Sequence, residues 1–126
     1  MLFKYIGDKQ DLSEMARLGY FDSYEIFVFT NDSGKIPHFH VRDKETMGQK
    51  FHTYIRIDKA EYFHHTGKED ILNKKERKEL VNFLRSNYRN RENETNWNHL
   101  IDLWNDNNSD VEINEDLEIP DYINMN

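Results

Sequence analysis

Three histidines, two arginines and a tyrosine alternate along two short stretches of the sequence, residues 37–42 and 51–57. Both stretches have a period of two, which is typical of β-strands, whose successive side chains point to opposite faces. The even-numbered positions therefore share one face of a predicted hairpin: His38, His40, Arg42, His52, Tyr54 and Arg56. Antiparallel pairing predicts that Arg42 lies near His52 and that His40 lies near Tyr54.

Two kinds of binding chemistry fit this face. Neutral imidazole nitrogens ligate transition metals, so His38, His40 and His52 could together hold a metal ion. Guanidinium groups beside an aromatic ring could instead hold a phosphate or a nucleotide. In a third interpretation the face has no ligand, and its histidines hydrogen-bond their neighbours or the backbone. No carboxylate with clear ligand spacing joins the set, so we expect no metal and no cofactor, and we assign no catalytic residue.

The odd-numbered face of the hairpin is largely apolar and is expected to lie in the core, under helices. Its members are Phe39, Val41, Phe51, Thr53, Ile55 and Ile57. Residues 24–30 are β-branched and aromatic, which predicts a central strand buried on both faces. Shorter strands are expected at residues 2–5 and 62–63, and a turn at residues 31–34.

Capping residues and apolar periodicity predict three helices. A capping-box pattern beginning at Asp11 predicts a short N-terminal helix that ends near Gly19. Asn73 is expected to cap a helix over residues 74–88, and Thr95 a further one. The last helix has apolar residues at the i, i+3, i+4 and i+7 positions: Trp97, Leu100, Ile101 and Trp104. The link between these two helices is short and polar, so we expect an antiparallel pair packed against the sheet.

The helix expected over residues 74–88 carries basic residues beside its apolar face: Lys74, Lys78, Arg85 and Arg89. Such a basic stripe could be a solvated flank whose long side chains cover the edge of the core. It could also follow phosphate groups, or receive the acidic end of the chain. Nucleic acid is the least favoured of these partners, because the acidic end would repel the phosphates that the stripe attracts.

Charge divides the chain into a neutral body and an acidic end. The net charge is −7, and all 17 lysines and arginines lie at or before Arg91. Residues 106–126 contain no base and seven acids: Asp106, Asp110, Glu112, Glu115, Asp116, Glu118 and Asp121. The body, residues 1–105, therefore balances to zero. We expect it to be a single α+β domain, followed by an acidic C-terminal extension at 106–126.

Aliphatic residues are interspersed with the acids of this extension: Val111, Ile113, Leu117 and Ile119. This pattern predicts docking, either along the sheet edge of the same domain or on a partner protein. The acids expected to face basic side chains are Asp110, Glu112, Glu115, Asp116 and Glu118.

A chain of 126 residues has room for one domain with one core. It contains no cysteine, which excludes disulfides and thiolate metal sites. No stretch approaches the roughly 20 apolar residues that span a bilayer, and the first residues lack the apolar segment of a signal peptide. We therefore expect a cytoplasmic protein without a membrane partner.

The strand at residues 24–30, an Asn-Asp turn and the sequence Pro37-His38-Phe39-His40-Val41 resemble the small bacterial "domain of unknown function 4160" proteins. The resemblance covers roughly residues 24–105 and implies a second strand followed by two helices. The N-terminal segment, the loop near residues 64–69 and the acidic extension depart from the family. The family has no established activity and is often encoded among small paired genes of toxin–antitoxin type, so the resemblance implies a fold and no chemistry.

Together these features predict an α+β fold, in which an antiparallel sheet of about three to five strands packs against a C-terminal antiparallel helix pair, with a short N-terminal helix. The favoured function is a non-catalytic protein-binding module, either an accessory protein or one of inhibitor or antitoxin type, of bacterial, phage or mobile-element origin. Its expected partner is another protein with a basic surface. The alternative is a small nucleotide- or metal-binding enzyme centred on His38, His40 and His52.

Overall fold

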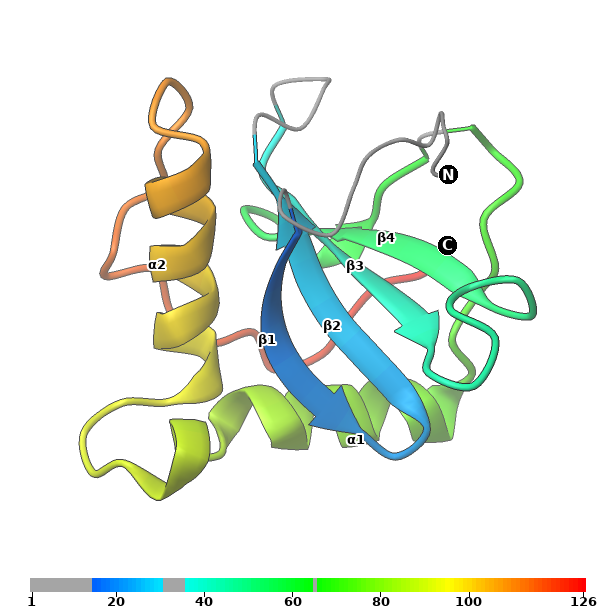
Figure 1. Cartoon of the computed structure of the whole chain (residues 1–126), viewed down its shortest axis with the longest axis horizontal. Coiled ribbons are helices and arrows are strands. Elements are labelled where there is room, and N and C mark those ends of the chain that lie inside the picture. The colour runs from blue at the N-terminus through cyan, green and yellow to red at the C-terminus, as the bar shows by residue number, and fades with distance from the viewer. Residues whose placement is uncertain (1–14, 31–35, 65) are drawn as a thin grey trace, which may run out of the picture.

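The computed structural model describes residues 15–30, 36–64 and 66–126. Within these ranges, five antiparallel strands form one sheet, in which sequence neighbours are also spatial neighbours (Figure 1). The strands are β1 (Met15–Phe21), β2 (Tyr24–Phe29), β3 (His38–Asp43), β4 (His52–Arg56) and β5 (Glu61–Tyr62). Helix α1 (Lys74–Arg85), the 3-10 turn η2 (Tyr88–Asn90) and helix α2 (Asn96–Asn107) follow. The α+β class is confirmed. The strand expected at residues 2–5, the cap at Asp11 and the turn at residues 31–34 lie outside the described ranges.

The predicted N-terminal helix is wrong for the residues that the structure describes, because β1 occupies the segment in which it was expected to end. This strand pairs with β2 through a two-residue turn at Asp22 and Ser23, with Asp22 at a φ of 53°. The pairing buries Leu18 and Phe21 of β1 in the core. Burial against a neighbouring strand thus favours a strand over a helix for residues 15–21.

Helices α1 and α2 begin at the predicted caps, Asn73 and Thr95, and each cap is completed by a capping box. Figure 1 shows the two helices crosswise rather than as the expected antiparallel pair, with α1 below the sheet and α2 beside β1. The link between them contains Arg89, Asn90 and Asn93 at positive φ, so the chain turns more than once before α2 begins. None of the helices in the described residues combines the length and the apolar character that a membrane span requires.

The odd-numbered face of the hairpin lies in the core, as predicted. Phe39, Val41, Ile55 and Ile57 are buried in one cluster with the apolar faces of both helices. The helical members of this cluster include Leu80, Leu84, Trp97, Leu100, Ile101 and Trp104. The apolar faces of both helices therefore pack against the odd-numbered face. Alternation places the even-numbered hairpin residues on the opposite side of their strands, although the ring of His38 still contacts Trp104 of α2.

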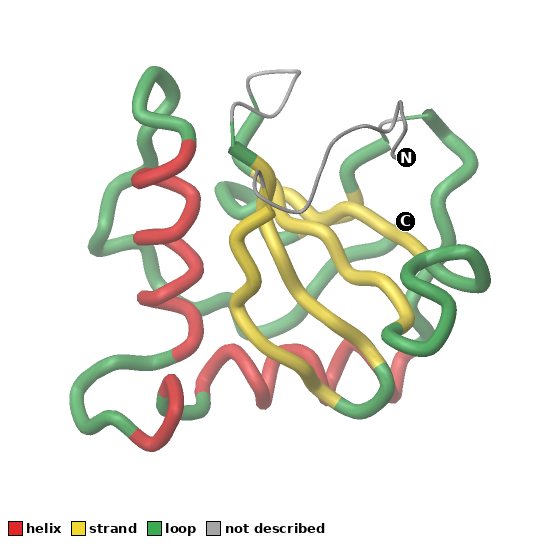
Figure 2. The backbone as a smooth tube through the Cα atoms, viewed as in Figure 1, coloured by secondary structure: helices red, strands yellow, loops and turns green. Residues whose placement is uncertain are grey.

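Residues after α2 continue as a loop that returns to the sheet (Figure 2). The backbone N–H of Tyr62 in β5 donates to the carbonyl oxygen of Asn124 at 2.7 Å, and the N–H of Asn124 donates to Ala60 at 3.0 Å. Ile123 and Met125 are buried in the main core. The boundary expected at residue 105 thus falls inside α2, and the end of the acidic extension belongs to the same core as the body.

Candidate functional site

Strands β3 and β4 pair in the predicted register. The opposed pairs are Arg42 with His52, His40 with Tyr54, and His38 with Arg56. Six side chains that lie up to 18 positions apart in the sequence are thereby brought to one face of the sheet. Period-two alternation fixes this arrangement, because a slip by one residue would move every side chain to the other face.

The loop between β3 and β4 is organised by Asp43. Its carboxylate accepts hydrogen bonds from the hydroxyl and backbone N–H of Thr46 and from the backbone N–H groups of Gly48 and Phe51. The bond from the Thr46 hydroxyl, supported by those from the backbone, lowers the pKa of Asp43 to about 2. The ionised carboxylate thus ties the ends of the two strands together.

His40 and His52 form a hydrogen-bonded pair. Nδ1 of His40 lies 3.1 Å from Nε2 of His52, so one ring donates an N–H and the other accepts through a lone pair. Burial, together with the nearby His40 and Arg42, lowers the pKa of His52 to about 4. The His40 ring also stacks on Phe27, with 4.8 Å between centroids. At neutral pH His52 is therefore uncharged and packed among aromatic rings.

His38 is fully buried. Its Nδ1 lies 2.7 Å from the carbonyl oxygen of Ile36, a distance at which the ring donates to the backbone. The ring stacks nearly parallel to Tyr54 and also contacts Phe63 and Trp104. His38, His40 and His52, together with the aromatic rings around them, form what we call the hairpin layer, on the face of the sheet away from α1. His38 and His40 are buried, whereas His52 and Tyr54 are half-buried.

Arg42 belongs to an ion-pair network that the sequence analysis missed. Its Nε donates to the carboxylate of Glu25 at 2.8 Å, its guanidinium lies over the ring of Phe27, and Arg17 also donates to Glu25. The Glu25 side chain is only 5% exposed. The available signal was Glu25 itself, because a lone acid inside an apolar strand needs a cationic partner on a neighbouring strand. Arg56 pairs with Asp58 instead, at 2.8 Å.

These contacts limit the chemistry available to the hairpin layer. Among the described residues, no group of three or more histidine, cysteine, aspartate or glutamate side chains is arranged to hold a metal ion. His40 and His52 bond to each other, and His38 bonds to the backbone. The hydrogen bonds of the histidines go to a neighbour or to the backbone, and much of the layer is buried among aromatic rings.

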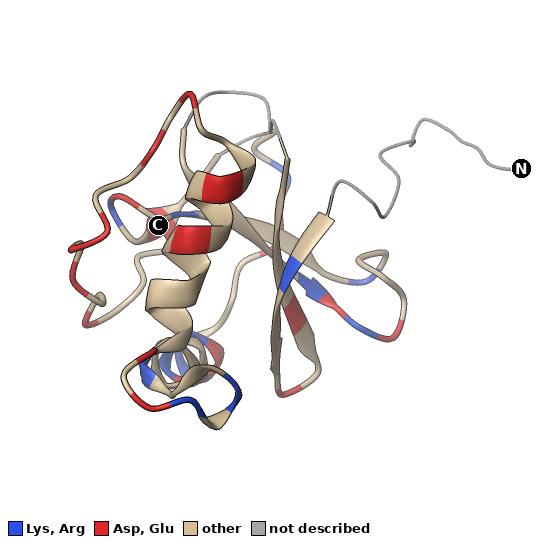
Figure 3. Cartoon of the chain, turned by 60° about the vertical axis from the view of Figure 1, so that its left-hand side comes forward, with Lys and Arg blue, Asp and Glu red and all other residues tan. Residues whose placement is uncertain are grey.

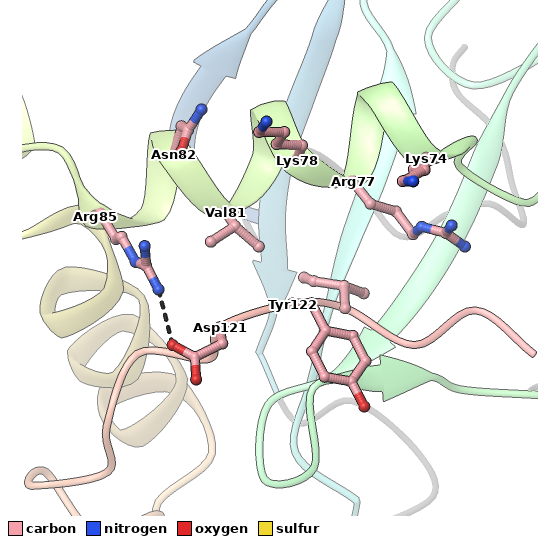
Figure 4. Close-up of a pocket in the computed structure, with 9 residues that line it drawn as sticks. Lys74, Arg77, Lys78, Val81, Asn82, Arg85, Asp121 and Tyr122 are labelled. Carbon is pink, nitrogen blue, oxygen red and sulfur yellow. Dashed lines mark hydrogen bonds and ion pairs between the residues drawn. The ribbon is translucent and has the colours of Figure 1, made fainter.

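The basic stripe lies along a groove between α1 and the C-terminal segment (Figure 4). Lys74, Lys78 and Arg85 line it, together with Arg77, which the sequence analysis did not single out. Arg89 lies elsewhere, because α1 ends at Arg85 and Arg89 follows in a turn at a φ of 49°. Three of the four predicted cations therefore share the groove, which we call the basic groove.

The acidic extension is held against α2 by side-chain hydrogen bonds. The indole Nε1 of Trp97 donates to the carbonyl oxygen of Leu117 at 2.8 Å, and that of Trp104 donates to Val111 at 2.8 Å. The amide side chain of Asn105 bonds to both the N–H and the carbonyl of Ile113. The extension therefore docks on its own domain, along α2 and, at Asn124, beside β5.

Docking orients the two kinds of side chain in opposite directions. Ile113, Leu117 and Ile119 pack against the core. The predicted acids are all exposed: Asp110, Glu112, Glu115, Asp116 and Glu118. Figure 3 shows acidic positions along this loop and on α2. We call these five acids and the α2 residues Asp102 and Asp106 the acidic face.

Acids on the acidic face influence one another. Burial raises the pKa of Asp102, and the negative charges of Glu115 and Asp106 raise it further. The ion pair between Arg85 and Asp121, at 3.0 Å, lies at the other end of the extension, beside the basic groove. The acidic face is thus a surface on which like charges accumulate.

The predicted residues therefore lie in three separate regions: the buried hairpin layer, the basic groove along α1, and the acidic face over α2. The last two regions are accessible to a partner, whereas most of the first is not. Comparisons of the chain with models of protein families, with curated proteins and with solved structures found no match.

Proposed function

We propose that this chain is a non-catalytic protein-binding module that presents the acidic face to a partner protein with a basic surface. The observation that supports this proposal most directly is the docking of the extension. Two indole N–H groups and one side-chain amide fix its backbone, while its carboxylates remain in solvent. A binding surface that is ordered before the partner arrives loses less conformational entropy on association.

Electrostatics supports the same proposal. Burial is the main cause of the raised pKa of Asp102, and the nearby charges of Glu115 and Asp106 add to it. A basic partner would relieve that repulsion between like charges. A surface of one sign also attracts an oppositely charged partner over distances of about 8–10 Å at physiological ionic strength. This module would act as an accessory, inhibitor-like or antitoxin-like protein. The resemblance to the "domain of unknown function 4160" proteins stays a prediction.

The alternative function, a small enzyme centred on His38, His40 and His52, has less support. A nucleophile, base or metal ligand must reach its substrate, whereas His38 and His40 are 0% and 3% exposed. A general base also works best when its pKa lies near the operating pH, and the pKa of His52 is about 4. We therefore assign the hairpin layer to stability rather than to catalysis.

The proposal can be tested by removing charge from the acidic face without disturbing its packing. In the variant Glu112→Gln/Glu115→Gln/Glu118→Gln, each exposed carboxylate becomes a neutral amide of similar size. The full chain and this variant are immobilised and incubated with a lysate of the organism of origin, and the bound proteins are identified by mass spectrometry. We expect a basic protein that binds the unmodified chain, dissociates as salt increases and binds the variant at least about tenfold more weakly.

A matched control removes three exposed acids elsewhere, in the variant Asp22→Asn/Glu45→Gln/Glu92→Gln. The net charge changes equally, so a partner that recognises the acidic face should bind this control like the unmodified chain. Equal loss of binding in both variants would mean that only net charge matters. Unchanged binding in both would move the interface away from the acidic face.

A further inference from the structure

The basic groove has a wall, a floor and a rim of different chemistry. One wall is the stripe of α1 that contains Lys74, Arg77 and Lys78. The buried side chains of Val81 and Ile123 contribute apolar surface to its floor. Asp121 and Tyr122 of the C-terminal segment form the opposite rim (Figure 4). The groove, which is open to solvent on one side, has a volume of about 410 Å³, within the range typical of small-molecule sites.

The cations of the groove are largely uncompensated. Four positive side chains face one carboxylate, that of Asp121, which leaves a local charge of +3. Arg85 pairs with Asp121 at 3.0 Å. Lys74, Arg77 and Lys78 form no side-chain hydrogen bond or ion pair with any described residue. Glu76, an acid on the same helix, is engaged instead by the backbone N–H of the cap residue Asn73 and by the hydroxyl of Tyr24.

Tyr122 gives the groove an aromatic surface that the fold does not use. Its side chain is 72% exposed, the highest value among the large exposed hydrophobic residues of the described chain. Its backbone is anchored on one side by the buried Ile123, and on the other side Asp121 forms an exposed ion pair with Arg85. An anchored, exposed ring offers a stacking surface for another planar ring at a low cost in conformational entropy.

We propose that the basic groove binds a small ligand that combines a phosphate group with an aromatic ring, as a nucleoside monophosphate does. Lys74, Arg77 and Lys78 hold the phosphate, and Tyr122 stacks on the ring above the apolar floor. The groove volume favours a ligand of mononucleotide size over a long polymer, whose further phosphates would meet the acids of the extension. This site lies apart from the acidic face and does not depend on the proposed protein partner.

The test measures binding of AMP to the full chain by isothermal titration calorimetry at about 50 mM salt, where surface charges are weakly screened. We expect one saturable site. Ribose 5-phosphate, which lacks the aromatic ring, and adenosine, which lacks the phosphate, should each bind at least fivefold more weakly. Lys74→Ala/Lys78→Ala should weaken AMP binding at least tenfold, and Tyr122→Ala at least threefold. Both sites are exposed, so the variants should fold, which their far-ultraviolet circular dichroism spectra can verify.

Lys75→Ala is the matched control. Lys75 is an exposed lysine on the same helix that does not line the groove. Its loss changes the net charge by the same amount as one of the groove lysines, so AMP affinity should stay within twofold. The proposal is overturned if AMP does not bind, if Lys75→Ala weakens binding as much as Lys78→Ala does, or if Tyr122→Ala has no effect. It is also overturned if a poly-glutamate peptide binds the groove while AMP does not, because the groove would then take an acidic peptide.

Discussion

Side chains on the face of the sheet away from α1 show how a polar pattern can be part of a core. His40 and His52 satisfy each other through a hydrogen bond of 3.1 Å, and the Phe27 ring lies against His40. Neutral imidazoles tolerate burial when each polar nitrogen has a partner. The pattern that looks like a ligand set in the sequence therefore serves packing in the folded chain.

The low pKa of His52 predicts a loss of stability in mild acid. Its pKa is about 4 in the folded chain and 6.5 for the unperturbed group, so between these values the unfolded state binds a proton that the folded state does not. Stability is therefore fully present above pH 6.5 and decreases as the pH falls towards 4. Between pH 7 and pH 5 the free energy of unfolding should fall by about 2 kcal/mol from this group alone.

Urea unfolding at several pH values measures this loss. His52→Gln keeps a hydrogen-bonding side chain beside His40 and cannot titrate, so its stability should depend less on pH across this range. His64→Gln, at an exposed position, serves as the control and should retain the dependence of the unmodified chain. An unchanged pH dependence in His52→Gln would show that another group carries the effect.

Glu25 and Arg42 form a buried ion pair. Removing one partner should therefore destabilise the fold more than removing both partners. The side chains are 5% and 12% exposed. Arg42→Leu leaves Glu25 with only the partly exposed Arg17 and should destabilise the fold by about 3–5 kcal/mol. Adding Glu25→Leu removes the uncompensated charge and should recover much of the lost stability. Chemical unfolding of both variants tests this coupling, and Arg56→Leu, which breaks a more exposed pair, should cost no more than about 1 kcal/mol.

The sequence predicted these residues to different extents. Alternation fixed the pairs Arg42–His52 and His40–Tyr54, because register follows directly from the period of two. The burial of the layer was not predictable from the same pattern, since alternation shows which side chains share a face and not what covers that face. The role of Glu25 was not predicted, because it depends on an ion pair with Arg42, which lies on another strand.

At the scale of elements, the caps at Asn73 and Thr95 were confirmed, whereas the N-terminal helix, for the residues that the structure describes, and the antiparallel helix pair were wrong. Asn73 and Thr95 cap α1 and α2 because their side chains bond to amides only three residues ahead. The capping pattern at Asp11 and the antiparallel helix pair depended instead on what else packs nearby. The predicted basic stripe included Arg89, which does not belong to it, because α1 ends at Arg85 and Arg89 lies outside the groove.

Helix α2 holds the extension chiefly through the indole groups of its two tryptophans. Trp97 is 1% exposed and donates to Leu117. Trp97→Ala should therefore cost about 3–5 kcal/mol, because a large cavity replaces the ring. Trp97→Phe retains most of the apolar volume and should cost less, about 1–3 kcal/mol, since the carbonyl of Leu117 loses its donor.

Hydrogen exchange separates these two effects of Trp97. The backbone N–H of Ile113 bonds to Asn105 and reports on whether the extension is docked. In Trp97→Phe this amide should exchange faster, while amides in the centre of β2 change little. Equal protection of Ile113 in the variant and in the unmodified chain would show that the indole bond does not hold the extension.

At the scale of the whole molecule, the extension combines two opposing contributions to stability. Its exposed acids repel one another, whereas its last residues are buried in the core. Ile123 and Met125 are 3% and 4% exposed, and neither is marked in the sequence by periodicity, because they stand among asparagines at the end of an acidic stretch. The sequence therefore predicted a charged surface and missed the anchor that fixes it.

Deletion of residues 106–126 decides between these contributions. Burial of two aliphatic side chains contributes roughly 3–6 kcal/mol, at about 1.5–3 kcal/mol each. Relief of repulsion between exposed charges is worth about 1 kcal/mol or less per pair. The lost burial should outweigh the relief of repulsion. The shortened chain should therefore unfold at a much lower urea concentration, although its net charge is zero.

Ile123→Ala/Met125→Ala should reproduce most of this loss of stability in the full-length chain. Glu112→Gln/Glu115→Gln/Glu118→Gln, which removes charge alone, should be as stable as the unmodified chain or slightly more stable. If the shortened chain instead unfolds at the same urea concentration as the full chain, residues 1–105 are an independent domain and the buried ends of the extension contribute nothing to it.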